Sequence, residues 1–292
     1  KRFGTGETVS WEGKITLIAG ATHAIHKTRQ LFSNMGERFL CYNIDTPDRE
    51  EATLRTMKNH EGDLSGFRRN MQSSLKSLMD VELVQKFPTD LPKLTDEFRG
   101  NIVRVAEFVT RARSTVERDM RSPQKDIVEV YPPEMPTRFA AQMQKISEAT
   151  MVLNHYNHGG DAQMRPEDFE MLYKFCFDSI PGKKRKVLQV CAKYEVVDTA
   201  AVAIQMNLPT NTVRRWLEDY NALEIIDRTK GGGNKGDKWS IKPDYRDTIA
   251  KFEHVEVKGG EYTENDAFEE SGLVDGDVIR EAQAAVDDFD RL

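Results

Sequence analysis

Residues 181–243 read PGKKRKVLQVCAKYEVVDTAAVAIQMNLPTNTVRRWLEDYNALEIIDRTKGGGNKGDKWSIKP, and this stretch decides the expected fold of the C-terminal half. A basic first helix is predicted over 183–193, followed by a second helix of small residues, AAVAIQM. The turn Asn207-Leu208-Pro209 leads into a third helix, TNTVRRWLEDY. Two strands, 223–228 and 238–241, then flank a hairpin rich in glycine and lysine.

This order of elements predicts a winged helix-turn-helix, in which the third helix enters the major groove and the hairpin lies on the flanking backbone. Val213, Trp216 and Leu217 are expected to face the core, which leaves the polar side chains of that helix toward solvent or DNA. Arginine pairs with phosphate or guanine, and few obvious base readers are present, so backbone binding is favoured over reading of sequence. The expected DNA contacts are Lys183, Lys184, Arg185, Thr210, Asn211, Thr212, Arg214, Arg215, Lys230, Lys235 and Lys238.

Charge is distributed unevenly along the chain, whose net charge is −6. Residues 181–243 carry 12 Lys and Arg against 7 Asp and Glu (+5), whereas residues 244–292 carry 5 against 15 (−10). A basic module beside an acidic segment is typical of nucleic-acid binders, and residues 246–292 are expected to form a flexible acidic tail. Winged helices also serve in protein contacts, and basic residues can be an ordinary solvated surface, so a role in protein interaction stays open.

Composition restricts the class of protein. No apolar run approaches the roughly 20 residues of a membrane span, and no signal-peptide pattern is present. Cys41, Cys176 and Cys191 are odd in number and far apart, as expected of buried thiols in a reducing compartment, and they lack metal-site spacing. We therefore expect a cytoplasmic protein with no membrane partner and no metal site.

The N-terminal part combines two apolar runs with a longer helical region. Residues 14–22 (KITLIAGAT) and 38–44 (RFLCYNI) predict buried strands, with a short helix between them over 23–35. Residues 48–180 are predicted to be largely helical. The expected fold class is mainly α with a small α/β portion.

Residues 14–44 resemble the end of an AAA+ ATPase core of the MCM-like helicase type, and PTRFAAQMQKISEATMVLN resembles the lid helix of that family. The resemblance places Thr22 at the sensor position, Arg38 at the arginine-finger position and Arg138 at the sensor arginine of the lid. It implies a core edge over 1–47, a helical lid or linker over 48–180, and a winged helix over 181–245. Thr22 stands where the family more usually has Asn, and Glu37 stands where Ser is common.

The resemblance implies the C-terminal portion of an ATP-dependent helicase or replication-initiation ATPase, of phage, plasmid or mobile-element type, acting as a homo-oligomeric ring. ATP and Mg²⁺ would be bound only by the full-length protein, since no Walker A or clear Walker B sequence is visible. In GGGNKGDK, Asp237 stands where a phosphate loop requires Lys. The chain also begins at Lys1 without Met, and we expect it to be a fragment. The alternative is a non-enzymatic winged-helix transcriptional or plasmid regulator with a helical partner-binding half. Structural ion pairing is the other interpretation of Arg38 and Arg138.

Overall fold

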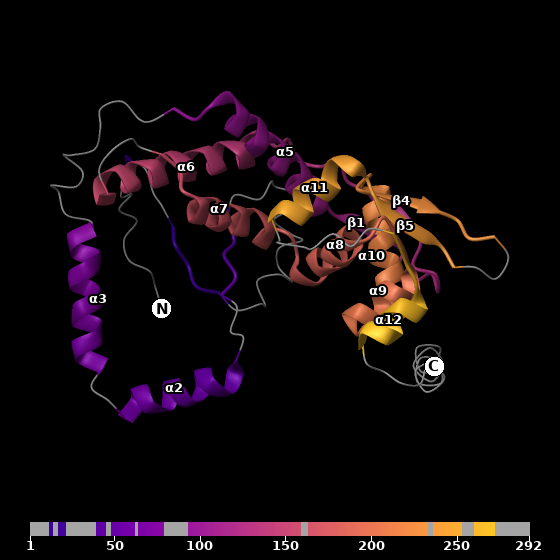
Figure 1. The fold of residues 1–292 in the computed structure, drawn as a ribbon, viewed down its shortest axis with the longest axis horizontal. Coiled ribbons are helices and arrows are strands. Elements are labelled where there is room, and N and C mark those ends of the chain that lie inside the picture. The colour runs from indigo at the N-terminus through magenta and orange to yellow at the C-terminus, as the bar shows by residue number, and fades with distance from the viewer. Residues whose placement is uncertain are drawn as a thin grey trace, which may run out of the picture. The chain divides into compact units, whose positions relative to one another are not determined.

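The computed structural model describes residues 12–13, 17–21, 39–44, 48–61, 64–78, 93–158, 163–232, 236–252 and 260–271. Their contacts divide the chain into two units, residues 1–37 and 38–292, and the elements below belong to the second unit. Among the described residues of this unit, helices dominate and are accompanied by two small sheets (Figure 1). The expected mainly helical class is therefore confirmed.

The two predicted N-terminal strands do not form where the structure describes them. Residues 17–21 have no regular structure and are exposed, with Leu17 at 66% and Ile18 at 94%. Residues 39–44 also form no strand, although Asn43 and Tyr42 contact α7 (Pro166–Asp178). A strand needs a neighbour to pair its backbone N–H and C=O groups, and an apolar run does not supply one. The strand predictions are thus wrong for these residues, whereas the predicted helix over 23–35 lies outside the described residues.

Helices occupy much of residues 49–178, as the sequence predicted. They are α2 (Arg49–Glu61), α3 (Leu64–Leu78), α5 (Asp96–Ala112), α6 (Thr137–His158) and α7. Thr95 caps α5 by accepting a hydrogen bond from the Phe98 backbone N–H, and Pro166 occupies the first turn of α7.

A β-hairpin follows α5, in a segment that the sequence pattern did not identify as sheet. Strand β1 (Val116–Arg118) pairs antiparallel with β2 (Ile127–Val130). The turn between them includes Lys125 with φ 53°, a left-handed conformation that few non-glycine residues adopt. The hairpin places Arg118 close to the C-terminal elements.

Residues 182–241 adopt the expected order of elements with one further strand. They form α8 (Gly182–Lys193), β3 (Val196–Asp198), α9 (Thr199–Met206), α10 (Thr210–Ala222), β4 (Ile226–Thr229) and β5 (Lys238–Ile241). Asp198 caps α9 by accepting a hydrogen bond from the Ala201 N–H, and Asn207 ends α9 in the left-handed region. Strands β4, β5 and β3 pair antiparallel in that order.

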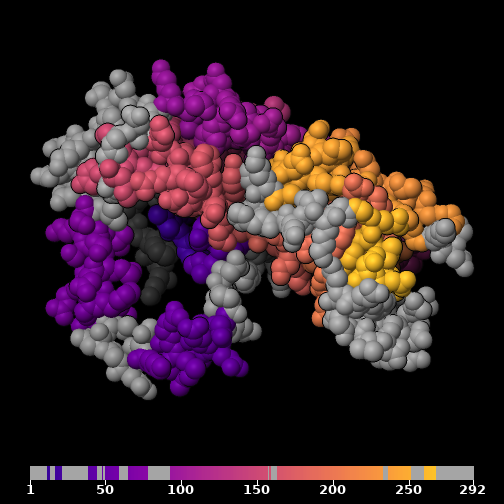
Figure 2. All heavy atoms as spheres, viewed as in Figure 1, coloured from indigo at the N-terminus to yellow at the C-terminus, as the bar shows by residue number. Residues whose placement is uncertain are grey.

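The start of the acidic segment is folded, which differs from the flexible tail expected there. It contains α11 (Pro243–Phe252), β6 (Glu261–Tyr262) and α12 (Glu264–Ser271), and Figure 2 shows α12, in yellow, at the surface. Strand β6 pairs parallel to β3, and α12 packs against α9. Tyr262 is buried and stacks on Tyr194 at 4.0 Å, while Asp198 accepts a second hydrogen bond from the Glu264 N–H. Burial of Tyr262 and this shared cap stabilise the segment despite its charge.

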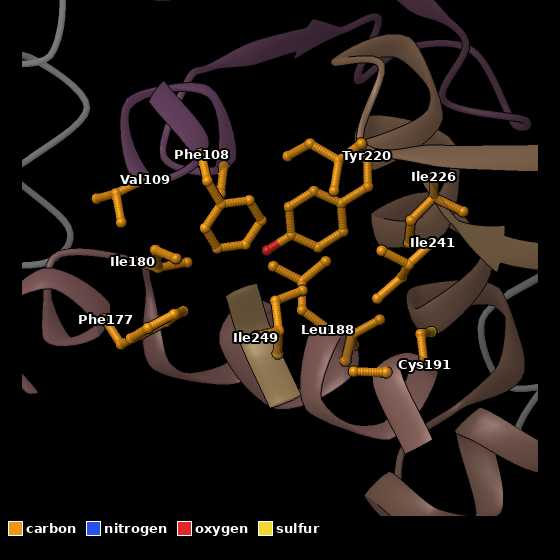
Figure 3. Packing of buried hydrophobic residues seen from close by; sticks show 14 of the residues in the cluster. Phe108, Val109, Phe177, Ile180, Leu188, Cys191, Tyr220, Ile226, Ile241 and Ile249 are labelled. Carbon is orange, nitrogen blue, oxygen red and sulfur yellow. The ribbon is translucent and has the colours of Figure 1, made fainter. Parts of the chain in front are cut away.

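One continuous hydrophobic cluster joins these elements, from Leu94 before α5 to Ala267 in α12. Figure 3 shows Phe108 and Phe177 within this cluster, and their ring centres are 5.9 Å apart. The ring centre of Tyr245 lies 5.4 Å from that of Phe108. Cys176 and Cys191 are buried in the same cluster, as expected, and burial raises the pKa of the Cys191 thiol to about 12. Both thiols are therefore packing groups.

The Tyr220 hydroxyl lies within this cluster, and it has no hydrogen-bond partner among the described residues. The hydroxyl points toward Phe108 and Ile249 (Figure 3). Burying an unpaired hydroxyl costs free energy, so Tyr220→Phe is expected to raise the free energy of unfolding by about 1 kcal/mol. Urea unfolding measures this change. Tyr262→Phe is the matched control: it removes an acceptor of the Gln205 amide at 2.6 Å, and we expect it to destabilise. A loss of stability in Tyr220→Phe would contradict the prediction.

Candidate nucleic-acid interface

Helix α10 has one buried side and one side directed away from the core. Val213, Leu217 and Tyr220 are fully buried. A helix turns 100° per residue, so the residues on the opposite side can be assigned from the spacing. We call that side the outer face of α10, and it comprises Asn211, Arg215, Glu218 and Ala222.

Three of the predicted DNA-contacting cations are exposed. They are Lys183 in the first turn of α8, Arg214 beside the outer face of α10, and Lys230 just after β4. Within the described part of the chain none of them is in an ion pair. The predicted polar contacts Thr210, Asn211, Thr212 and Arg215 are half-buried, and Lys235 lies outside the described residues.

Three other predicted cations are held by carboxylates. The Lys184 Nζ lies 2.9 Å from an Asp219 carboxylate oxygen, Arg185 pairs with Asp178, and Lys238 pairs with Glu261 of β6. Arg185 and Asp178 are the most buried of these pairs, with side-chain exposures of 16% and 0%. Because their charge is neutralised within the protein, these cations add little to the free basic surface.

Arg118 of β1 reaches the outer face of α10 and was not identified from the sequence. Its guanidinium donates to an Asp219 carboxylate oxygen at 2.9 Å, to the Arg215 carbonyl at 2.8 Å and to a Glu218 carboxylate oxygen at 3.2 Å. A fourth bond, at 2.7 Å, goes to the Lys125 carbonyl within the hairpin. Arg118 and Asp219 are only 11% and 7% exposed. An isolated arginine in a polar stretch gives no sequence signal for such a role.

The β4–β5 hairpin is held by contacts between its own strands. The Arg228 guanidinium lies 5.2 Å from the ring centre of Trp239 and pairs with Asp237. Asp237 also accepts a hydrogen bond from the Gly231 N–H at 3.3 Å. The aspartate found where a phosphate loop would require lysine thus fixes the hairpin.

The described residues include only one of the three residues predicted for ATP chemistry. Thr22 and Arg38 lie outside the described residues, and Arg138 is an exposed residue in the first turn of α6. Across the described ranges, no group of three or more His, Cys, Asp or Glu side chains could hold a metal ion. In the same ranges no helix is long and apolar enough to cross a membrane.

Comparisons of the chain with family models, with curated proteins and with solved structures found no match. Function is therefore inferred from the arrangement of residues around α10.

Proposed function

We propose that residues 182–241 form a winged helix-turn-helix that binds DNA, chiefly through its phosphate backbone. The observation that carries the proposal is the packing of α10 against α8, α9 and β4, in a sheet where β4 pairs with β5 and β5 with β3, with a glycine- and lysine-containing hairpin between β4 and β5. Exposed cations lie in the three parts of such a module that approach DNA: Lys183 in α8, Arg214 in α10 and Lys230 in the hairpin.

Backbone binding is favoured because the outer face of α10 offers little for reading bases. Glu218 is tied to Arg118, and Arg215 and Asn211 are half-buried. Hydrogen bonds to phosphate fix a protein on the duplex without carrying sequence information. The expected substrate is therefore duplex DNA of any sequence.

Removing the three exposed cations tests the proposal. In Lys183→Ala/Arg214→Ala/Lys230→Ala, affinity for a random-sequence duplex is expected to fall by about tenfold or more, and the slope of log K against log salt to decrease by about 2–3, close to 0.9 per lost phosphate contact. Fluorescence anisotropy at several salt concentrations measures both quantities.

The charge-matched control is Lys93→Ala/Arg104→Ala/Lys145→Ala, which removes three exposed cations before α5 and on α5 and α6. This variant should keep the affinity and the salt slope of the unchanged chain. Salt-independent binding by the unchanged chain, or equal losses in both triple variants, would overturn the proposal.

Two wider roles would use this DNA-binding surface: the C-terminal portion of an ATP-dependent helicase, and a non-enzymatic regulator. The lack of strands over residues 17–21 and 39–44 removes one support for the ATPase role. That role also needs Thr22, Arg38 and Arg138 near a nucleotide bound by a neighbouring subunit of a longer protein. We therefore place DNA binding first, and ATP hydrolysis in a ring stays a separate prediction.

A further inference from the structure

Hairpin β1–β2 is fixed directly to the side of α10 that a winged helix uses to read DNA. Three of the four Arg118 hydrogen bonds end on α10, at the Arg215 carbonyl and the Glu218 and Asp219 carboxylates. Lys184 of α8 holds the other Asp219 oxygen at 2.9 Å. Arg118 therefore occupies the outer face of α10 beside Arg215 and Glu218, and it fastens the hairpin there.

The width of the major groove decides whether α10 can enter it together with the hairpin. The major groove is about 12 Å wide and admits an α-helix or a two-stranded ribbon. A helix with its side chains already measures about 10–12 Å across. With the Arg118 side chain bound to this face and the hairpin fastened beside it, α10 is too thick to enter the groove from Arg215 onward. The first turn of α10, with Thr210 and Asn211, precedes this part.

The charge of the hairpin does not suit a second DNA-binding wing. Residues 115–131 carry three basic and four acidic side chains, a net charge of −1. Glu117 and Glu129 face each other in the strand register. The Tyr131 hydroxyl donates to Glu117 at 2.7 Å, and this bond raises the pKa of Tyr131 to about 12. The hairpin thus flanks the helix without adding surplus positive charge for phosphate.

We propose that hairpin β1–β2, anchored by Arg118, determines specificity by keeping α10 out of the major groove, so that DNA is held by its backbone without sequence preference. This inference rests on the proposed DNA binding. The face that Arg118 occupies includes Arg215 and Glu218, two side-chain types that read guanine and cytosine edges once they are free.

Methylation of guanine N7 by dimethyl sulfate tests the inference on the unchanged chain, because N7 lies in the major groove. With a duplex saturated by protein, N7 methylation is expected to equal that of free DNA. Protection over three or more neighbouring base pairs would overturn the inference, since it requires a helix in the groove. A chain that shows no salt-dependent binding to the duplex would overturn the proposed function as well.

Removal of the hairpin gives a second test. The Tyr131 N–H donates to the Thr115 carbonyl at 3.2 Å, so an Asn-Gly turn can replace residues 116–130. In selection from a randomised duplex pool, this variant is expected to enrich preferred sequences by about tenfold, the discrimination of one good bidentate contact, while the unchanged chain enriches none.

Arg118→Gln, which loosens the anchor but keeps the hairpin, should show the same enrichment to a smaller degree. Arg121→Ala is the matched control, since Arg121 is an exposed cation in the same hairpin and should leave selection unchanged. Equal enrichment by the unchanged chain and the hairpin-deleted chain would contradict the inference.

Discussion

Replacing Asp178 with alanine lowers the free energy of unfolding by an expected 3–5 kcal/mol or so, the usual cost of removing one partner of a buried ion pair. Asp178 ends α7, and its side chain has no exposed surface. The carboxylate pairs with Arg185 and with Lys174 at 3.0 Å, and it accepts a hydrogen bond from the Asn43 N–H at 2.7 Å. Alanine would leave the nearly buried Arg185 guanidinium without its carboxylate.

Urea unfolding of the two chains measures this loss. Asp227→Ala is the matched control, because Asp227 is an exposed aspartate of β4, and its removal should change stability by no more than about 0.5 kcal/mol. A loss of less than about 1 kcal/mol in Asp178→Ala would show that the pair contributes no more than an exposed ion pair.

The same carboxylate predicts how stability depends on pH. Burial by itself raises the pKa of Asp178, but the Asn43 N–H, Arg185 and Lys174 together outweigh burial and lower it below the ordinary value. A group whose pKa is lower in the folded state stabilises the fold above its unfolded pKa, about 3.9 for aspartate. The difference in the free energy of unfolding between the unchanged chain and Asp178→Ala should therefore be constant from pH 5 to pH 7, by the same linkage. It should decrease as the pH falls through the folded pKa.

The elements that were predicted correctly carry local signals. Helices α8, α9 and α10 have apolar periodicity, and Asp198 and Asn207 mark the two ends of α9. The glycines after Lys230 mark the β4–β5 hairpin. Strands β1, β2, β3 and β6 were missed because they are only two to four residues long, too short for a clear alternating pattern. Their formation depends on partners distant in the sequence.

The candidate site was predictable only in part for the same reason. The sequence shows that Lys183, Lys184 and Arg185 are basic, but it does not show that two of them are paired. Lys184 meets Asp219 at a separation of 35 positions, and Arg118 meets the same residue across 101 positions. The acidic segment was predicted to be flexible from its charge, whereas Tyr262 and Ala267 bury enough surface to hold its first part in place.

Phe108→Ala is expected to lower the free energy of unfolding by about 3–5 kcal/mol, as for other large side chains removed from a core. Phe108 is fully buried on α5 and contacts the rings of Phe177 in α7 and Tyr245 in α11. Since one hydrophobic cluster extends from α5 to α12, the loss should weaken the helices of residues 93–180 and the α10 region together. Two probes can separate this outcome from independent unfolding of two domains.

Tryptophan fluorescence reports on the C-terminal elements in a Trp11→Phe background, where the remaining tryptophans are Trp216 in α10 and Trp239 in β5. Far-UV circular dichroism reports on the helices as a whole. Both transitions should move to the same lower urea concentration in Phe108→Ala, because a single cooperative body unfolds in one step. Val103→Ala removes an exposed side chain of the same helix and should leave both transitions in place. If the dichroism shifted while the fluorescence transition stayed, α5 to α7 would be a separate domain, and the anchoring of α10 by Arg118 would be a contact between independent parts.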